Sequence, residues 1–535
     1  MTSSPHAGEV RRRRTFAIIS HPDAGKTTLT EKLLLFAGAI QIAGSVKARK
    51  ASRHATSDWM EIEKQRGISV ASSVMQIEYR DCVINLLDTP GHQDFSEDTY
   101  RVLTAVDAAL MVIDAANGVE EQTRRLIDVC RARKTPILTF VNKLDREVRE
   151  PLELLDEIEA ALGMASVPLT WPVGQGKLFH GIYDLRDDVI RVFRPGRDRL
   201  TEDDETLSGL DRGALEARFG SEYVRAAEEM ALVRGAMPAF THTEFLAARQ
   251  TPVFFGSAIN NFGVREVLDA LVDLAPSPGE RQSLSRIVQP EEAKFSGVVF
   301  KIQANMDPAH RDRIAFLRVC SGRFEPGMRL KVRRTGKELR PTNVVTFLSQ
   351  RRDRVEAAYS GDIIGIATHG GLQLGDTLSE GEALQFTGLP FFAPEIFRAI
   401  ELADPMKSKQ LAKGLKELGE EGAIQVFRPL LGSLMLLGAI GQLQFEVALH
   451  RLKTEYGVDA RLSAANYTGA RWISCLDPVE LNRFVHANGS KVYMDAAEAH
   501  AYLLASRFDL GLTKERWPKI EFHPMREHAG LLLQG

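Results

Sequence analysis

The segment Ser20-His21-Pro22-Asp23-Ala24-Gly25-Lys26-Thr27 directly follows a short apolar run, Thr15–Ile19. A glycine turn ending in Gly-Lys-Thr between a strand and a helix is typical of phosphate-binding loops, because backbone N–H groups and the helix N-terminus point at the phosphates. We expect Lys26 to reach the β- and γ-phosphates and the Thr27 hydroxyl to bind Mg²⁺. Ser20 stands where glycine or alanine is usual, and its small side chain should be tolerated. An ordinary strand-to-helix turn is the alternative, which the Gly-Lys-Thr context disfavours.

A second motif, Asp88-Thr89-Pro90-Gly91-His92, follows the apolar run Val83–Leu87. Asp88 is expected to hold Mg²⁺ through water, and the Gly91 N–H to contact the γ-phosphate. His92 occupies the position at which small GTPases carry the glutamine that orients the attacking water. This motif predicts a sensor of the terminal phosphate with His92 as the catalytic residue.

Two further motifs predict recognition of guanine. They are Asn142-Lys143-Leu144-Asp145, after Pro136–Val141, and Gly256-Ser257-Ala258, after Val253–Phe255. The Asp145 carboxylate can accept from both N1–H and the exocyclic amine of guanine, whereas adenine would leave it unpaired in a desolvated pocket. The aliphatic stem of Lys143 can lie along the base. Ser257 and Ala258 are expected to place a backbone N–H near guanine O6.

The stretch from Gly44 to Ser69 has little periodicity and lies between the first two motifs. Its end, Gln65-Arg66-Gly67-Ile68-Ser69, suits a loop that orders around γ-phosphate and Mg²⁺. Ser69 is the expected second hydroxyl ligand of the metal. By itself the stretch would be taken for an ordinary loop, and its place between Thr27 and Asp88 favours the switch interpretation.

Composition indicates an ordinary soluble globular protein of three or four domains: 535 residues, 44% hydrophobic, 26% charged, net charge -3. The net charge does not favour nucleic acid, so RNA contacts must come from local patches. The cysteines are scattered, which disfavours zinc or disulfides and suggests a reduced cytoplasmic setting; they are Cys82, Cys130, Cys320 and Cys475. No stretch approaches the roughly 20 apolar residues of a membrane helix. Arg11–Arg14 is expected to be a solvated basic tail rather than the start of a signal peptide.

The pattern of apolar runs predicts three domains. Residues 1–280 read as an α/β GTP-binding domain with a parallel sheet, interrupted by an inserted subdomain at about 165–245. Residues 281–388, after a Pro-rich linker, alternate apolar and polar residues as in a small β-barrel. Residues 389–535 form an α+β domain in which two strand–helix–strand units suggest a ferredoxin-like fold. The last 70 residues show no assignable pattern.

The motifs resemble those of the translational GTPases, in which a histidine stands at the position of His92. Four segments are specifically similar in sequence to the bacterial peptide chain release factor three family: Ser20–Thr28, Thr56–Met60, Gln65–Val70 and Asp88–Tyr100. The likeness continues through Leu103–Asp114, Pro136–Arg146 and Thr170–Val173, and less specifically to Gly441–Gly457. Elongation factor G resembles the first three domains but continues for two more.

The resemblance implies a function in translation termination. It implies GTP and GDP binding with Mg²⁺, and activation at the GTPase-activating centre of the ribosome, where ribosomal RNA positions His92. GTP-driven conformational change would release class-one peptide chain release factors, without codon reading. By the same resemblance Asp23 would hold a monovalent cation. The protein would be cytoplasmic, monomeric off the ribosome and not bound to a membrane.

A cluster of basic residues lies in the predicted barrel, with few acidic residues beside it. It comprises Arg323, Arg329, Lys331, Arg333, Arg334, Lys337, Arg340, Arg351, Arg352 and Arg354. Such charges can form a stripe that contacts RNA phosphates. A solvated face without a partner is the alternative. No aromatic residues are interleaved, which favours binding of folded RNA by shape and backbone.

Other functions remain open on the sequence alone. An elongation-type or ribosome-rescue GTPase is an alternative of the same class. A small-molecule kinase would need an acceptor pocket and would not need Asn142–Asp145. A GTP-binding scaffold without hydrolysis would not need His92. Guanine preference and stimulation of hydrolysis by ribosomes separate these alternatives.

Overall fold

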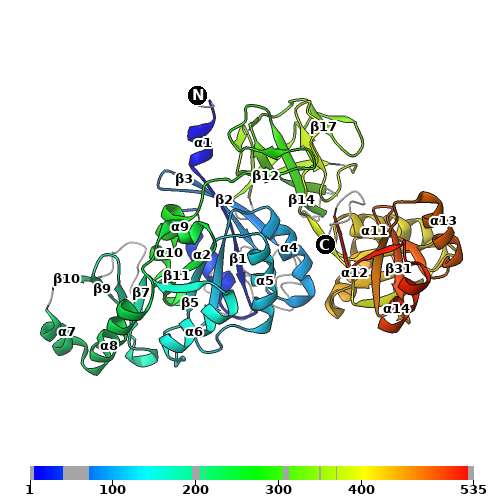
Figure 1. Ribbon diagram of the computed structural model, residues 1–535. Coiled ribbons are helices and arrows are strands. Elements are labelled where there is room, and N and C mark those ends of the chain that lie inside the picture. The colour runs from blue at the N-terminus through cyan, green and yellow to red at the C-terminus, as the bar shows by residue number, and fades with distance from the viewer. Residues whose placement is uncertain are drawn as a thin grey trace.

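The apolar runs that precede the nucleotide motifs form neighbouring strands of one sheet. The computed structural model describes residues 5–39, 72–194, 205–209, 211–304, 313–348, 351–368 and 370–527. The sheet has the order β2-β3-β1-β4-β5-β11-β6, parallel except for β2 (Figure 1). Its strands are β1 (Arg13–Ser20), β2 (Ser73–Tyr79), β3 (Cys82–Asp88), β4 (Ala108–Asp114), β5 (Ile137–Asn142), β6 (Ala165–Pro168) and β11 (Gln250–Phe255).

Both faces of this sheet are buried under helices. On β1, Phe16 and Ile18 belong to one hydrophobic cluster, and Ala17 and Ile19 to another, because successive side chains of a strand point to opposite faces. The first cluster includes α2 (Lys26–Phe36) and α10 (Val264–Leu274). The second includes α4 (Ser96–Thr104), α5 (Glu121–Ala132) and α6 (Pro151–Leu162). Strands buried on both faces explain the continuous apolar runs of the sequence.

The predicted insertion forms a separate small sheet covered by helices. The sheet has the order β10-β9-β8-β7, with β7 (Thr170–Val173), β8 (Gly181–Asp184), β9 (Val189–Val192) and β10 (Thr206–Ser208). The helices are α7 (Arg212–Phe219) and α8 (Ser221–Ala236), whereas α9 (His242–Leu246) packs on β11 of the main sheet. Strand β6 pairs with β11 of the main sheet, so residues 165–168 are part of that sheet rather than of the small one.

The barrel region is an eight-stranded antiparallel sheet of order β18-β17-β23-β14-β15-β22-β19-β20. It lies above the nucleotide domain in Figure 1. Its strands are β14 (Ser296–Ala304), β15 (Arg313–Ser321), β17 (Leu330–Val332), β18 (Glu338–Leu339), β19 (Val344–Leu348), β20 (Arg351–Arg354), β22 (Ile363–Thr368) and β23 (Thr377–Ser379). Short pairs flank it: β12 (Arg281–Gln282) with β13 (Ile287–Val288), and β16 (Arg323–Phe324) with β21 (Ala358–Tyr359).

The C-terminal region confirms the ferredoxin-like prediction and adds to it. Strands β28, β25, β27 and β26 lie side by side in this order, with α11 (Ser408–Glu420) and α12 (Gln442–Tyr456) between them in sequence. Pairing of β26 with β30 extends the same sheet to eight strands. The remaining elements are β24 (Pro390–Phe392), β25 (Ile396–Leu402), β26 (Gln425–Pro429), β27 (Leu436–Ala439), β28 (Ala460–Ala464), β29 (Gly469–Ser474), α13 (Pro478–Ala487), β30 (Val492–Met494), β31 (His500–Leu504), α14 (Arg507–Arg516), β32 (Glu521–His523) and β33 (Met525–Glu527).

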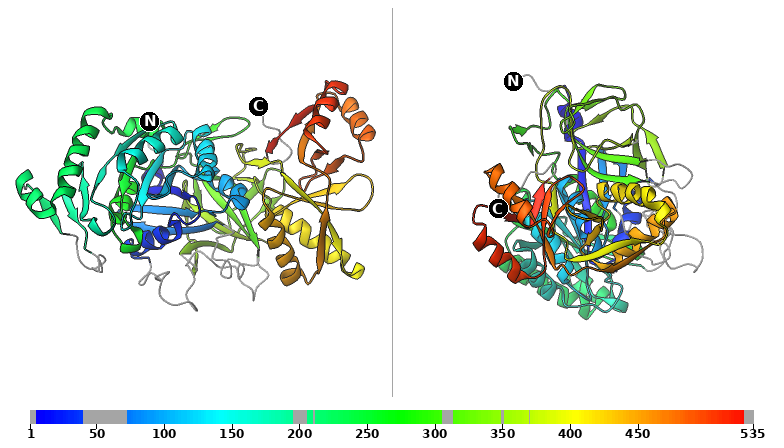
Figure 2. Two further views of the ribbon diagram at one scale, coloured as in Figure 1. Left: turned by 90° about the horizontal axis from the view of Figure 1, so that it is seen from below. Right: turned by 90° about the vertical axis from the view of Figure 1, so that its right-hand side faces the viewer.

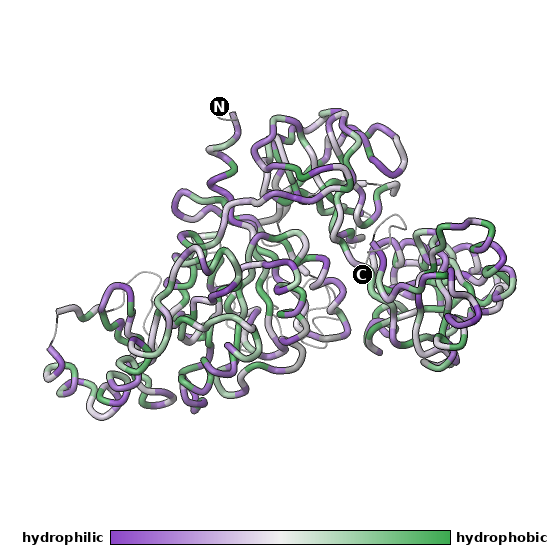
Figure 3. The backbone as a smooth tube through the Cα atoms, viewed as in Figure 1, coloured by the Kyte–Doolittle hydropathy of each residue, from purple (hydrophilic) through white to green (hydrophobic). Residues whose placement is uncertain are grey.

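The three regions form distinct lobes, and the C-terminal lobe lies to one side of the nucleotide domain in the left-hand view of Figure 2. Hydrophobic and hydrophilic stretches alternate along the chain in every lobe (Figure 3). One sequence expectation is wrong: the basic N-terminal segment is not a solvated tail. Residues Ala7–Arg11 form α1, and Arg13 is buried in an ion pair with Asp362 of the barrel region. Pairing with that carboxylate offsets the cost of burying the guanidinium.

Candidate nucleotide site

The phosphate loop lies where the sequence predicts it, between β1 and the first turn of α2. Gly25 has φ +93°, a left-handed conformation that favours glycine. A Cβ added there would lie 2.4 Å from Asn142 Nδ2, and that amide donates to Ala24 O at 2.8 Å. The guanine motif therefore packs directly on the phosphate loop, and Gly25 is required by both conformation and contact.

Lys26 and Asp88 form a buried ion pair at the start of α2 and the end of β3. They are 6% and 2% exposed, and Asp88 Oδ2 has no hydrogen-bond partner in the part of the chain that the structure describes. A buried carboxylate oxygen without a donor is costly, so this atom is available to a cation or a water held by one. The neighbouring Thr89 hydroxyl donates to Ile18 O at 2.7 Å, which fixes the loop beside β1.

His92 lies in the loop after Asp88 and is partly exposed, with 30% of its side chain accessible. Its Nδ1 accepts from the Asp94 N–H at 3.2 Å, and its ring lies 6.2 Å from that of Phe95. With Nδ1 engaged in this way, Nε2 is the ring nitrogen that remains for a water or a phosphate. The arrangement is suited to a residue that acts on a ligand from the mouth of the site.

The guanine motifs form a hydrogen-bonded unit at the ends of β5 and β11. Asn142 Oδ1 accepts from the N–H groups of Lys143 and Ala258, at 2.8 and 2.9 Å. Asp145 Oδ1 accepts from the Ser257 hydroxyl at 2.6 Å. The Ala258 N–H, which the sequence predicts near guanine O6, is therefore hydrogen-bonded to Asn142 within the protein. The Asp145 carboxylate is oriented by Ser257, as recognition of a base requires.

Lys143 connects both ends of the site. Its Nζ donates to Asp114 Oδ2 at 2.7 Å and to the carbonyl oxygen of Asp23. Burial alone would raise the pKa of Asp114, but hydrogen bonds from Lys143 and the Ala116 N–H outweigh it and lower that pKa. Burial also lowers the pKa of His21, despite nearby Glu120. The site therefore holds Asp114 ionised and His21 neutral at neutral pH.

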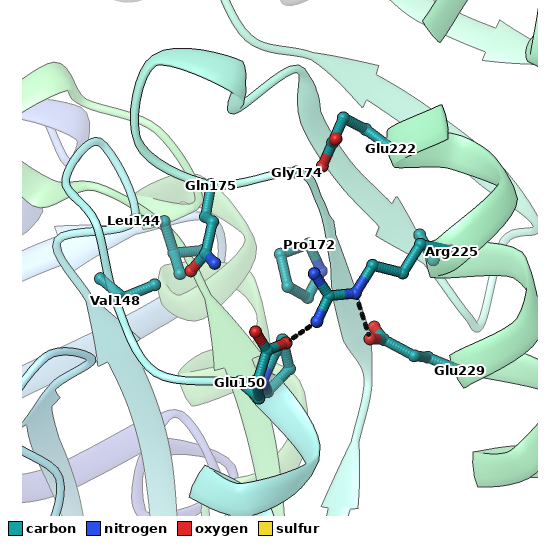
Figure 4. Close-up of a pocket in the computed structure, with 11 residues that line it drawn as sticks. Leu144, Val148, Glu150, Pro172, Gly174, Gln175, Glu222, Arg225 and Glu229 are labelled. Carbon is teal, nitrogen blue, oxygen red and sulfur yellow. Dashed lines mark hydrogen bonds and ion pairs between the residues drawn. The ribbon is translucent and has the colours of Figure 1, made fainter. Parts of the chain in front are cut away.

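The inserted segment contacts the guanine loop from outside. The Gly176 N–H donates to Leu144 O at 2.9 Å. Beside this contact lies a cavity of about 30 Å³, with Leu144 and Gln175 in its wall (Figure 4). Figure 4 also shows Arg225 of α8 between Glu150 and Glu229, with 3.1 Å from Arg225 Nε to Glu229. The insertion thus supports the segment that carries the predicted guanine motif.

The C-terminal lobe contacts the loop that carries His92. Asp94 Oδ2 accepts from the Leu443 N–H in the first turn of α12, at 2.7 Å. A Cβ on Gly441 would lie 1.9 Å from Asp94 Cγ, so only glycine fits. Farther along, Glu97 accepts from Gln425 at 3.0 Å and Arg101 donates to Gly422 O at 3.2 Å. The residues after the phosphate sensor therefore form much of this interface.

The structure brings together most of the predicted site residues and adds three. The predicted residues lie at the carboxyl ends of β1, β3, β5 and β11 or in the segments that follow these strands. They are Ser20 to Thr27, Asp88 to His92, Asn142 to Asp145, Ser257 and Ala258. Ser69 and the rest of Gln65–Ser69 lie outside the described residues. Sequence reasoning missed Asp94, Asp114 and Asn260, whose Nδ2 donates to the Ser257 hydroxyl at 2.8 Å. Asp114 is the last residue of β4, the strand beside β1, and this position at the end of a strand could have identified it from the sequence.

Comparisons with known proteins agree with this geometry. Residues 11–277 match the family model described as elongation factor Tu GTP binding domain. Residues 294–381 match elongation factor G domain 2, and residues 386–514 match the C-terminal domain of class II release factor RF3. A crystal structure of a Thermus thermophilus protein has a TM-score of 0.68 at 24% identity, covering 90% of this chain and 72% of its own; this likeness concerns the fold.

The fold and the site define a translational GTPase, which binds GTP and GDP and hydrolyses GTP. Two relatives named peptide chain release factor 3 match over 98% of both chains. The protein from Bordetella avium is 70% identical over 523 residues, and that from Nitrosomonas europaea 69% identical over 527. The chain belongs to the peptide chain release factor 3 family. It is a GTPase of translation termination that interacts with the ribosome.

Within the described part of the chain, no helix has both the length and the apolar character needed to cross a membrane. The four cysteines are free thiols. The described residues contain no group of three or more potential metal-ligating side chains.

Proposed function

We propose that GTP binding moves the C-terminal lobe of this protein and thereby releases class-one peptide chain release factors from the ribosome. The observation that carries the proposal is the contact between the His92 loop and α12. Asp94 lies two residues from His92, and its carboxylate accepts from the Leu443 N–H. A shift of this loop therefore changes an interface between two lobes.

The contact is well suited to respond to a nucleotide. A carboxylate at the N-terminus of a 15-residue helix is stabilised by the helix dipole, by about 0.3–1 kcal/mol. The Gly91 N–H, three residues before Asp94, is the proposed donor to the γ-phosphate. A ligand shifts an equilibrium only by its differential affinity for the two states. Contact with the γ-phosphate, present in GTP and absent in GDP, supplies such a difference.

The proposed roles of the site residues follow their positions. Lys26 exchanges its ion pair with Asp88 for the β- and γ-phosphates. The buried, unpartnered Asp88 Oδ2 fits Mg²⁺ and its waters, and Thr27, Asp88 and Ser69 would hold the ion. Bound Mg²⁺ would neutralise charge on the phosphates. His92 orients the attacking water, and Asp145 reads the base beside Lys143.

The proposed ribosome-facing surface lies on the barrel. Several of its basic side chains are exposed: Arg323, Arg329, Lys331, Arg333, Lys337, Arg340 and Arg354. Arg334 instead pairs with Asp376 at 2.8 Å and is not counted with them. Exposed cations of this kind bind RNA through its phosphates, and this binding weakens with salt. The protein is proposed to act in the cytoplasm, as a monomer when off the ribosome.

The test is GTP hydrolysis with and without ribosomes, followed by loss of bound class-one factor from terminated ribosomes. Strong stimulation with GTP-dependent release supports the proposal. Stimulation without release would favour the elongation-type or rescue alternative. A rate of GTP hydrolysis that ribosomes do not change would overturn the proposed activation. Asp94→Asn, compared with the exposed change Asp156→Asn on α6, should reduce release more than hydrolysis.

A further inference from the structure

A cavity of about 480 Å³ lies where the nucleotide domain, the barrel and the C-terminal lobe are joined. The ends of α4 and α5 contribute to its wall, as do barrel strands β14 and β15. The two linking segments, residues 276–282 and 386–389, complete it. It is distinct from the nucleotide site, whose motifs are absent from its lining.

Positive charge exceeds negative charge around this cavity. Four cationic side chains line it, Arg133, Lys134, Arg281 and Arg318, against two acidic ones, Asp107 and Glu280. Asp107 already pairs with Arg281 at 2.9 Å and with Arg318 at 2.5 Å. Glu280 accepts from Gln289 at 3.0 Å. One carboxylate thus serves two guanidinium groups, and two cations remain.

The cations retain capacity to bind a ligand. Arg133 donates to carbonyl oxygens, Gly388 O at 3.2 Å and Thr104 O at 3.4 Å, and no carboxylate of the described residues forms an ion pair with it. Arg318 is 1% exposed, and its buried Nε has no hydrogen-bond partner among the residues that the structure describes. Burial lowers the pKa of Arg318, and the charge of Arg281 acts in the same direction against Asp107. A bound anion would give Arg133 a negatively charged partner and Arg318 Nε a hydrogen-bond acceptor.

We propose that this cavity binds a small multivalent anion of the phosphate class. Guanidinium groups match phosphate oxygens through paired N–H donors. The volume lies within the range of small-molecule sites, about 300–1,000 Å³. A recess at a junction fits a small molecule better than a nucleic acid strand. An anion here contacts the nucleotide domain, the barrel and the two linking segments, and stabilises this arrangement of the joined parts.

The test is calorimetric titration of inorganic pyrophosphate into the full-length protein saturated with GDP, so that the phosphate loop is already filled. The expected result is saturable binding at one site. Arg133→Gln should weaken it about tenfold or more, since a hydrogen bond to a charged group contributes about 1.5–3 kcal/mol. Arg124→Gln removes the same charge from exposed α5 outside the cavity and should leave the affinity unchanged.

Three outcomes would overturn the proposal: no saturable binding, equal weakening by both variants, or Arg133-dependent binding of a short RNA but not of pyrophosphate. GDP affinity and melting temperature of Arg133→Gln report whether it folds. If it does not, Lys134→Gln takes its place, because Lys134 is an exposed residue at the cavity wall. The Lys134 variant should weaken binding by about threefold or more, and an unchanged affinity counts against the site.

Discussion

The two ends of the nucleotide site are built differently. At the base end, Asn142 Oδ1 accepts from the N–H groups of Lys143 and Ala258, and Asp145 accepts from the Ser257 hydroxyl, at 2.6–2.9 Å. At the phosphate end, Lys26 pairs with Asp88, while Asp88 Oδ2 has no hydrogen-bond partner among the described residues. The base end is thus complete within the protein, whereas the phosphate end needs a ligand to satisfy it. Recognition of guanine is preorganised, and the response to phosphate is not.

Each end also contacts a different accessory region. The base end contacts the insertion through Gly176 and Leu144. The phosphate end contacts the C-terminal lobe through Asp94 and Leu443. A nucleotide change at the γ-phosphate should therefore move the C-terminal lobe, while the insertion should respond mainly to whether any guanine nucleotide is bound.

The largest effect is expected at His92. His92→Ala should reduce ribosome-stimulated hydrolysis by about a thousandfold or more, because no group would orient the water. GTP binding should stay near normal, since His92 is partly exposed and, among the described residues, is hydrogen-bonded within its own loop. Single-turnover hydrolysis with ribosomes measures the first effect and equilibrium binding the second. Unchanged turnover would show that His92 does not orient the water at the phosphate end.

The next effect tests the base end. Asp145→Asn should lower GTP affinity on the order of a hundredfold and shift preference toward xanthosine triphosphate, because the amide presents donors where guanine also donates. Competition binding with both nucleotides measures the shift. Asp156→Asn, an exposed change on α6, is the matched control. Intact GTP affinity would show that Asp145 does not read the base.

A smaller effect is expected at the lobe interface. Gly441→Ala places a Cβ 1.9 Å from Asp94 Cγ and should cost the docked arrangement about 1–3 kcal/mol. Small-angle scattering should show a more extended molecule, while GDP affinity changes little. Gly511→Ala on α14, where a Cβ meets nothing within 4 Å, is the control. Identical scattering of both variants would show that the contact of the phosphate end with this lobe does not hold the docked arrangement.

The smallest effect is expected at the insertion. Arg225 is 51% exposed in its ion pair with Glu150, and such pairs contribute about 0.2–1 kcal/mol. Arg225→Ala should therefore speed GDP dissociation by at most about fivefold, as stopped-flow fluorescence can measure. Arg234→Ala breaks an exposed pair with Asp188 elsewhere in the insertion and should have no effect. A larger acceleration would mean that the insertion controls the base end more strongly than its contacts indicate.

Local sequence determined much of the fold. The strands before the four motifs appear where apolar runs predict them, since burial on both faces of a parallel sheet produces such runs. The ferredoxin-like units of the C-terminal region were predicted from alternating strand and helix patterns. The elements after residue 465 were not, because β30 joins the sheet only by pairing with β26, a contact between distant residues.

The sequence by itself determined the class of nucleotide chemistry, because the loop motifs that are proposed to contact phosphate and guanine each consist of a few adjacent residues. It also determined the family. Only the tertiary structure decided what these motifs touch: Asp94 against Gly441, Leu144 against Gly176, and Arg133, Arg281 and Arg318 around one cavity. These partners are far apart in the chain, and no local pattern encodes them. Their contacts arise because the insertion packs on the loop at Leu144 and the lobes pack on one another, so that each surface is completed by residues from a distant part of the chain.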